Sequence, residues 1–490
     1  MSTASRIESD LEQSVLSPKA RFWLLTKKPF FLTLSGIVFL AVFLGLSGSV
    51  PYVPRAVLSI TLAAIVLWVF EPIPFSMTAV IVLFALPVSG AASTDLVLSG
   101  FSSPAVFLIV AGMMIASAVQ QTDLGKRLTY LLLYWFGEIK GGVLAGILLI
   151  PQIMAIFIPA TAVRTAILLP IVYSVAEILG IKIGDVRSKQ LMMAVAVGCT
   201  ISGTAILPAA VGNVVTVDLA NYYLKQHITY LDWLLLALPL WLLLIPVAWW
   251  ILYRCFPVKE EAQKNLKEKV RGQIAELGPL TGKEKRLLLI LTGVFVLWIL
   301  EGVHGWPPVI PAFIGVVLIA WPGVRVAKWD SLLNINFSTL LLLGVTLSLG
   351  RVLSTSGAIG YLSKWLEHDW TRFLFSNPYL AVLMVIVLTQ LIHKVTSNVS
   401  TSVIATVPVV IALASQGAHV SILLLVFVSG LTSLFGFLLV VETIPSVMVH
   451  GTGWVTQKDF LRCGIWLTLT TTALTFLMAL TWWKWLGYMQ

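Results

Sequence analysis

The sequence predicts an all-α membrane protein with many spans, and three observations lead to that fold class. Hydrophobic residues make up 58% of the 490 residues, whereas charged residues make up only 11%. A helix that spans a bilayer needs about 20 largely apolar residues, and the chain contains roughly ten stretches of this kind. These runs are long and continuously apolar, which excludes an outer-membrane barrel built from alternating strands of about ten residues.

The expected spans begin after a polar segment of 29 residues. This segment ends in Lys27 and Lys28, and no A-x-A cleavage site follows the next apolar run, so that run predicts a retained helix and not a signal peptide. Two long apolar stretches, 141–180 and 377–415, are interrupted by small polar residues. The other expected spans are 30–49, 55–71, 75–91, 104–121, 190–215, 233–253, 287–303, 308–322, 336–353, 420–441 and 463–483.

The distribution of Lys and Arg predicts the orientation, because cytoplasmic loops hold an excess of these residues. We place the N-terminus inside and let each interrupted stretch return to the side it left. The inside then collects 24 of the 32 Lys and Arg, and the outside six. The chain is therefore expected in the cell (inner) membrane with residues 1–29 in the cytoplasm. The remaining two cations, Arg164 and Lys394, fall within the interrupted stretches.

The composition also excludes several partners and cofactors. The net charge of +10 is explained by the cytoplasmic loops, so it does not indicate a nucleic-acid partner. Cys199, Cys255 and Cys463 lie far apart without CxxC or CxxH spacing, so neither a metal site nor a disulfide framework is expected. We expect no cofactor and no metal, and the lipid bilayer is the expected surrounding.

Short matches between the two halves predict an internal repeat. VLWVFE at 66–71 recurs as VLWILE at 296–301, and four further matches have shifts between 235 and 238. We therefore expect one repeat at 55–255, with an inner hairpin at 141–180, and a second at 287–490, with an outer hairpin at 377–415. Each copy would hold five spans and one hairpin, so the second copy should be inverted. A charged cytoplasmic linker, 256–286, joins them.

Each interrupted stretch carries a cluster of small polar residues ahead of a proline, in IFIPATAVRTAILLP (156–170) and KVTSNVSTSVIATVP (394–408). These clusters predict the tips of re-entrant hairpins, where a new helix begins and its first N–H groups have no intrahelical partner. Such an end within a bilayer is tolerated where it is buried in protein or lines a wet cavity, and there it attracts anions. The alternative is two full spans joined by a short turn, which charge counting does not exclude.

A second broken helix is expected downstream of each tip. The segments GCTISGTAILPAAVGN (198–213) and SGLTSLFGFLLVVETIP (429–445) mix Gly, Ser, Thr and Pro into apolar runs, as in helices that unwind around a binding site. Small residues also serve close helix packing in membranes, which is the alternative for any one of them. As a pair in register with the tips, they favour a site.

Other classes of protein receive less support. The chain has no HExxH and no Walker A motif, because Gly282-Lys283 is followed by Glu284, so we do not expect an enzyme. A channel would need a continuous polar pore. Here the polar residues gather in two clusters at the expected midplane, which favours alternating access.

The paired tips, above all Thr396-Ser397-Asn398 with Pro408, together with the linker ELGPLTGKEKR (276–286), resemble the divalent anion/sodium symporter family of dicarboxylate, citrate and sulfate transporters. The resemblance covers nearly the whole chain after residue 30. It implies about 11 spanning helices plus two re-entrant hairpins, a homodimer with a scaffold and an elevator-like moving domain, and a carboxylate bound between the tips.

Two departures from the family pattern bear on coupling. Sodium-coupled members carry Ser-Asn-Thr at both tips, whereas Val399 follows Ser397-Asn398 here and the first tip reads Pro159-Ala160-Thr161. Arg164 resembles the Arg of the exchanger branch, such as the bacterial citrate/succinate and tartrate/succinate antiporters. The expected function is therefore sodium-independent exchange of di- or tricarboxylates, such as succinate, malate, tartrate or citrate, with Arg164 and Lys394 as fixed cations. The alternative is a sodium-coupled dicarboxylate or sulfate symporter.

The expected site combines both tips and both broken helices. His393 and Glu442 are candidates for charge coupling, and Glu442 could pair with Lys394 or Arg164. The residues expected to bind the substrate are Pro159, Ala160, Thr161, Arg164, Thr200, Ser202, Thr204, Lys394, Thr396, Ser397, Asn398, Ser400, Thr401 and Thr443.

Overall fold

The computed structural model describes residues 18–258, 266–396, 398–415 and 420–488, and within these ranges the chain forms helices and no β-strand. The predicted all-α fold is confirmed. Seven of the described helices are long and apolar enough to cross a membrane, or eight if the bent pair Thr94–Ser102 and Pro104–Gln120 forms one span. The chain is thus a multi-pass membrane protein. The 11 spans and the inversion of the repeats stay predictions.

The first half contains the predicted interrupted stretch as two helices. The helix α8 (Gly142–Phe157) is followed by three extended residues and then by α9 (Thr161–Ile178). The next expected span, 190–215, is broken into α10, η2 and α11. The helices of this half are α2 (Pro18–Gly45), α3 (Tyr52–Phe70), α4 (Phe75–Val88), α5 (Thr94–Leu98), η1 (Ser99–Ser102), α6 (Pro104–Gln120), α7 (Leu124–Phe136), α8, α9, α10 (Val186–Ile201), η2 (Leu207–Ala209), α11 (Val211–Leu224) and α12 (Tyr230–Cys255).

The second half follows the same order of hairpin, broken helix and closing helix. Its hairpin consists of α21 (Pro378–Thr396) and α22 (Val399–Ala414), and its broken helix of α23 (Ile422–Thr432), η3 (Val440–Glu442) and α24 (Ile444–Gly451). The other helices are α13 (Leu266–Glu276), α14 (Gly282–Ile299), α15 (Glu301–His304), α16 (Val309–Ala320), α17 (Trp329–Leu332), α18 (Phe337–Thr355), α19 (Ala358–Leu366), α20 (Asp369–Ser376), α25 (Gln457–Leu480) and α26 (Trp482–Trp485).

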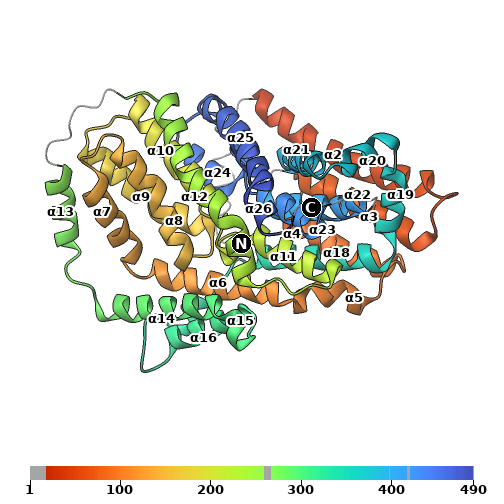
Figure 1. The fold of residues 1–490 in the computed structure, drawn as a ribbon, viewed down its shortest axis with the longest axis horizontal. Coiled ribbons are helices and arrows are strands. Elements are labelled where there is room, and N and C mark those ends of the chain that lie inside the picture. Colours follow the sequence, from red (N-terminus) through yellow and green to blue (C-terminus); the bar gives the residue numbers. More distant parts are fainter. Residues whose placement is uncertain (1–17, 259–265, 397, 416–419, 489–490) are drawn as a thin grey trace.

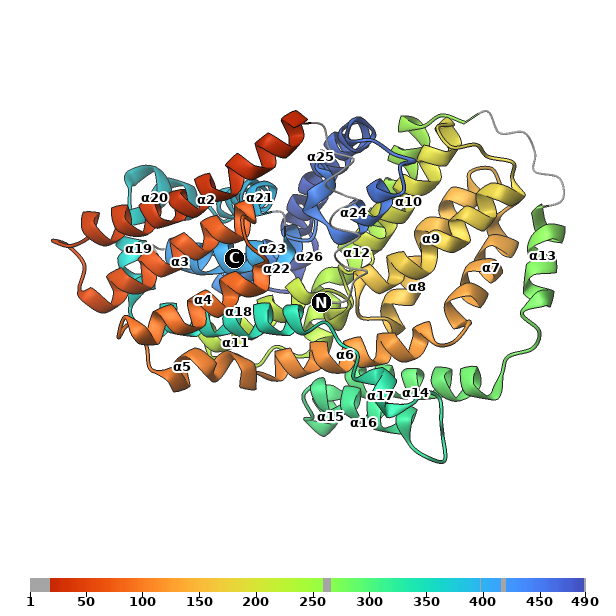
Figure 2. The same ribbon diagram turned by 180° about the vertical axis from the view of Figure 1, so that it is seen from behind.

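The two hairpins lie on either side of the chain's central helices. Figures 1 and 2 show α8 and α9 beside α7, α10 and α12 at one end, and α21 and α22 beside α2, α3 and α19 at the other. The helices α24 and α25 lie between these groups, and α23 packs against α21 and α22. The helices α14 and α16 project beyond α6 at one edge (Figure 1), and α16 packs against α6.

The two halves approach closely where η1 crosses α18. A Cβ atom on Gly100 would lie 2.4 Å from the backbone nitrogen of Ser348, and the N–H of Gly100 donates to Ser348 Oγ at 3.0 Å. Only a residue without a side chain allows this backbone approach, as is common in helix packing within membranes. Phe101 lies at the same contact, since a Cβ on Gly344 of α18 would be 2.4 Å from its ring.

Several elements differ from the expected spans. The first helix α2 begins at Pro18 and not at residue 30, and α4 and α16 are shorter than a full span. The helices α7, α19 and α20 were not expected, because with 13, 9 and 8 residues they are too short to span a bilayer. The linker also contains a helix, α13, and Arg127 of α7 holds the linker through Glu284 at 2.9 Å and three carbonyl oxygens.

Candidate functional site

The first hairpin tip is an extended segment that opens a helix without a side-chain cap. The chain leaves α8 at Phe157 and enters α9 at Thr161, and Ala160, the residue before α9, has no side chain able to bind the first N–H groups. Pro159 packs against α6, where a Cβ on Gly112 would lie only 2.9 Å from the Cβ of Pro159. The first N–H groups of α9 therefore have no side-chain acceptor from the capping position, which suits an anionic ligand.

Arg164 connects this tip to the first broken helix. Its side chain is fully buried, and its Nη1 and Nη2 donate to the carbonyl oxygens of Ile158 and Ala209, the latter at 3.0 Å. Its Nε has no hydrogen-bond partner among the described residues. The guanidinium thus occupies carbonyl oxygens that the two helix breaks leave without intrahelical donors.

The second tip has a side-chain cap. The Oδ1 of Asn398 accepts hydrogen bonds from the backbone N–H groups of Ser400 at 2.9 Å and Thr401 at 3.3 Å, at the start of α22. Thr396 ends α21 and is buried, and Ser397 lies outside the described residues. Asn is a favoured residue at this position because it satisfies N–H groups that the helix itself leaves unpaired.

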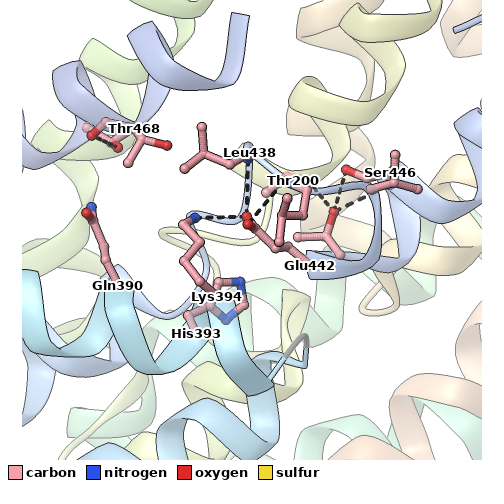
Figure 3. A network of polar contacts seen from close by, with 12 residues as sticks. Thr200, Gln390, His393, Lys394, Leu438, Glu442, Ser446 and Thr468 are labelled. Carbon is pink, nitrogen blue, oxygen red and sulfur yellow. Dashed lines mark hydrogen bonds and ion pairs between the residues drawn. The ribbon is translucent and has the colours of Figure 1, made fainter. Parts of the chain in front are cut away.

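Lys394 is paired with a carboxylate. Its Nζ lies 2.9 Å from Oε2 of Glu442, whose side chain is fully buried, while that of Lys394 is 19% exposed (Figure 3). The backbone N–H groups of Leu438 and Leu439 also donate to the Glu442 carboxylate, at 3.2 and 3.1 Å. Of the two partners considered for Glu442, Lys394 is the one that it contacts. The expectation of Lys394 as an unpaired fixed cation is wrong, because η3 turns Glu442 back toward α21.

His393 lies beside this ion pair (Figure 3). Its ring is buried, and neither ring nitrogen has a hydrogen-bond partner among the described residues. A Cβ on Gly436 would lie 2.6 Å from its Nε2, so the imidazole packs directly against the backbone of the second broken helix. A buried imidazole without hydrogen-bond acceptors is expected to be uncharged, because no neighbouring group would stabilise a positive charge on the ring.

Hydroxyl groups connect the two broken helices. Thr443 Oγ1 lies 3.4 Å from Thr200 Oγ1 and 2.8 Å from Ser446 Oγ (Figure 3). Ser202 and Thr204 instead donate to carbonyl oxygens within their own segment. Asn213, which the sequence analysis did not single out, donates through Nδ2 to Gly203 and Ile206 at 2.7 and 3.2 Å and so stabilises the first break.

A cavity of about 160 Å³ lies where the tips and the broken helices meet. Thr339 at the start of α18 also lines it and was not predicted, although it directly follows the repeated Phe337-Ser338. Among the predicted residues, those on the cavity wall are Thr161, Thr200, Asn398, Ser400, Glu442 and Thr443. The other predicted site residues that the structure describes do not line the cavity. They are Pro159, Ala160, Arg164, Ser202, Thr204, His393, Lys394, Thr396 and Thr401.

The cavity combines features that suit an anion. The helices α9, α22 and α24 begin at its wall, and the N-terminal end of a helix carries partial positive charge. Hydroxyl and amide groups of Thr161, Asn398 and Ser400 supply further polar contacts. Leu342, Leu343 and Leu434 form an apolar part of the wall, which is typical of a site that encloses a small organic ligand.

The fold and this cavity define a class: a multi-pass helical membrane protein with a partly polar cavity between two interrupted helical segments. Within that class, the chain belongs to the family described as the sodium:sulfate symporter transmembrane region, which it matches over residues 27–489. The family predicted from the tip motifs is confirmed.

Several relatives match most of the chain at low identity. A membrane protein of Cupriavidus necator is 26% identical over 454 residues, covering 89% of this chain and 88% of the relative. A sodium-dependent dicarboxylate transporter SdcS of Staphylococcus saprophyticus is 24% identical over 449 residues, covering 86% and 85%. A Staphylococcus aureus protein of the same name is 23% identical over 453 residues, covering 86% and 84%.

Proposed function

We propose that this chain is a secondary transporter of small dicarboxylates. The observation that carries the proposal is the cavity, because both hairpin tips and both broken helices contribute residues to it. Family membership and the names of two relatives support a dicarboxylate as the substrate. Neither the family nor these relatives point to an enzyme. Citrate, tartrate and sulfate stay alternative anions.

The proposed mechanism is alternating access. The hairpin tips and broken helices would move with the substrate as one domain, in an elevator-like motion against a scaffold, and the protein would work as a homodimer in the inner membrane with its N-terminus in the cytoplasm. The charge distribution supports this orientation, since 24 of the 32 Lys and Arg fall on the side that we place inside.

For the coupling ion, the relatives favour sodium. Two of them are named sodium-dependent dicarboxylate transporters, and the family description names sodium as well. These names support the sodium-coupled symporter better than the sodium-independent exchange that the tip motifs predict. Sodium-coupled uptake of a dicarboxylate is therefore the first candidate.

Sodium-independent exchange is the second candidate, and Arg164 favours it. A sodium ion is bound by oxygen atoms, and carbonyl oxygens at breaks of membrane helices commonly bind it. Here the guanidinium of Arg164 takes two such oxygens, on Ile158 and Ala209. A covalently fixed cation cannot leave with the substrate, so the empty site would carry an uncompensated charge past a barrier of low dielectric constant. That penalty would favour exchange over net uptake.

One experiment separates these candidates. The purified protein is reconstituted into liposomes, and uptake of labelled succinate is measured with and without external sodium and with and without internal succinate. Sodium-dependent uptake into empty liposomes supports symport, whereas sodium-independent uptake that needs internal succinate supports exchange. Competition by malate, tartrate, citrate and sulfate ranks the substrates. Failure to take up any of these anions in every arm would reject the transporter proposal.

A further inference from the structure

The helices α11 and α18 connect the cavity to a second group of polar contacts. Gly212 near the start of α11 lines the cavity, as do Thr339 and Leu343 in the first two turns of α18, and the two helices pack against each other (Figure 2). Asp218 and Arg351, which form an ion pair, lie six and eight residues beyond Gly212 and Leu343. At a rise of about 1.5 Å per residue, the ion pair is therefore roughly 10 Å along both helices from the cavity wall.

Asp218 joins α11 to the start of α6 and to α18. Its Oδ1 accepts a hydrogen bond from Oγ of Ser103, the capping residue of α6, and its Oδ2 lies 3.7 Å from Nη2 of Arg351. One turn farther along α11, Oη of Tyr223 donates to the carbonyl oxygen of Gly350 at 2.6 Å. An ion pair and two hydrogen bonds thus hold the end of α11 that points away from the cavity.

The partners of Asp218 are held by each other and not only by α11. Nη1 of Arg351 donates to the carbonyl oxygen of Ser99 in η1 at 2.6 Å, and the N–H of Gly100 in η1 donates to Ser348 of α18. The segments η1, α6 and α18 therefore keep these contacts when α11 moves. The side chain of Asp218, in contrast, loses both of its partners.

The ion pair borders a second cavity, which makes its separation less costly. This cavity measures about 400 Å³, and Asp218, Tyr222, Lys225 and Arg351 are among the residues that line it. The side chains of Asp218 and Arg351 are 14% and 17% exposed, and neither Oδ2 of Asp218 nor Nε of Arg351 has a hydrogen-bond partner among the described residues. An ion pair that reaches water and lacks a direct hydrogen bond is easier to open than a fully buried pair.

From these contacts we propose that Asp218, Ser103 and Arg351 form an outer latch, which closes the outer side of the protein and opens once in each transport cycle. The inference rests on the proposed function, in which the broken helix that ends in α11 moves with the substrate, and it assigns η1, α6 and α18 to the scaffold. The charge distribution places Arg351 among the six Lys and Arg on the outside, so the latch lies on that side of the cavity.

The outer latch controls access to the cavity from the outside. It joins the moving α11 to the scaffold, so a substrate outside reaches the cavity only after α11 separates from α6 and α18. A latch that stays closed should stop transport. A weakened latch should raise the population of the outward-open state, because the lost contacts stabilise only the closed state.

The first test closes the latch covalently. In the double variant Ser103→Cys with Asp218→Cys, the two thiols replace side chains in direct contact, so an oxidant should join them in a disulfide. Uptake of labelled succinate into proteoliposomes should then fall to the level of liposomes without protein, and a reductant should restore it. The single variant Asp218→Cys shows whether the native cysteines, which are buried and free, react instead.

The matched control is Ser117→Cys with Ser331→Cys, a pair within the proposed scaffold. Ser117 of α6 donates to the carbonyl oxygen of Ser331 in α17 at 2.9 Å, and Nε2 of Gln121 contacts the hydroxyl groups of both serines. The disulfide of this pair should leave succinate uptake unchanged, because α6 and α17 do not separate in the proposed cycle.

The second test weakens the latch and needs no uptake. Leu219 of α11 is 1% exposed, and its Cδ2 would lie 2.7 Å from a Cβ on Gly350 of α18. In Leu219→Cys, a membrane-impermeant thiol reagent outside intact cells should therefore react slowly. Adding Asp218→Asn should make this reaction several-fold faster. Adding Asp459→Asn, which breaks the similarly buried pair with Lys189 at 3.0 Å, should not change it.

Unchanged succinate uptake after the Ser103–Asp218 disulfide has formed would overturn the proposal. So would two thiols that do not join, since the side chains would then not be in contact, and so would a labelling rate that Asp218→Asn leaves unchanged. If the reduced double variant does not transport, the labelling test decides. Failure of the proposed function looks different, because the wild-type protein would then take up no succinate, whereas labelling would still report whether α11 separates from α18.

Discussion

The two hairpin tips have the same position in their halves but handle their exposed backbone groups differently. At the first tip an arginine, Arg164, supplies donors to free carbonyl oxygens, and the capping position holds Ala160. At the second tip Asn398 caps the new helix, and the nearby cation Lys394 is neutralised by Glu442. A shared backbone design can therefore carry a fixed charge at one tip and a neutral capped helix at the other.

This difference assigns separate roles to the tips. The first tip keeps both its positive charge and the uncapped N–H groups at the start of α9, two features that attract an anion. The second tip has already satisfied the first N–H groups of α22 with Asn398. We therefore expect changes at the first tip to affect transport most.

The largest effect is expected for Arg164→Ala. Two buried carbonyl oxygens would lose their donors, which should cost about 3 kcal/mol or more of stability, and transport should fall at least roughly a hundredfold. Arg164→Lys keeps the positive charge but cannot donate to both carbonyl oxygens in the same way. Its stability and transport rate should therefore lie between those of the wild type and Arg164→Ala. Thermal unfolding in detergent and initial rates of succinate uptake measure both quantities.

Arg127→Ala is the matched control, since Arg127 also donates to carbonyl oxygens, on Leu277 and Gly278, but does not line the cavity. It should lower the melting temperature without changing the KM for succinate. If Arg164→Ala and Arg127→Ala had the same effects on the melting temperature and on the KM for succinate, the separate role assigned to the first tip would be wrong.

A smaller effect is expected where the first broken helix meets the second tip. A Cβ on Gly212 would lie 2.4 Å from Cγ1 of Val399, so Gly212→Ala should cost about 1–3 kcal/mol by overpacking and should slow transport. Adding Val399→Ala removes the overlapping methyl group and should restore most of the loss. The measurement is again thermal unfolding together with uptake.

Gly293→Ala serves as the control for this pair, because a Cβ on Gly293 in α14 would meet no atom within 4 Å. That variant should unfold at or slightly above the wild-type temperature, as alanine favours helix more than glycine does. A Gly212→Ala protein with wild-type stability would show that the two elements are not in close contact.

Much of this site could be predicted from the sequence, because breaks in membrane helices are marked by particular residue types. Pro159, Asn398 and the Gly, Ser and Thr clusters at 198–213 and 429–445 mark the breaks, and the structure has breaks within each of these segments. Asn at a helix start also predicts its own capping bonds, and both are present in the structure.

The contacts between distant segments could not be predicted with the same certainty. Glu442 was compatible with two partners, and only the turn of η3 decides for Lys394, 48 residues away. Thr339 reaches the cavity because α18 passes beside the second tip, which no local pattern encodes. The amphipathic helices α7, α19 and α20 could not be predicted as spans, since they are only 13, 9 and 8 residues long and interrupt their apolar faces with charged residues.

The capping difference between the tips gives a third prediction. Asn398→Ala should cost about 1 kcal/mol through the loss of the cap, and it should raise the KM for succinate several-fold because the Asn398 side chain itself lines the cavity. The reverse change, Ala160→Asn, adds a cap to the first tip. It should raise stability by up to about 1 kcal/mol but weaken succinate binding, because the new side chain competes for N–H groups that the substrate would use.

The two variants should thus move stability in opposite directions and affinity in the same direction. Thermal unfolding with and without succinate separates the two effects. An Ala160→Asn variant that bound succinate as well as the wild type would show that the N–H groups of α9 do not contact the substrate.

The smallest effect is expected for His393→Gln. The imidazole makes no hydrogen bond to a described residue, so its replacement leaves no buried partner unsatisfied, and the loss should stay near 1 kcal/mol or below. Because we treat His393 as uncharged, the pH dependence of the KM for succinate should be that of the wild type. Gly436→Ala should be worse tolerated, since its Cβ would lie 2.6 Å from Nε2 of His393 and 2.7 Å from Cβ of Glu442, and adding His393→Ala should relieve only the first of these overlaps. A His393→Gln protein whose KM depended on pH differently from that of the wild type would show that the imidazole titrates, and the second tip would then carry a charge of its own.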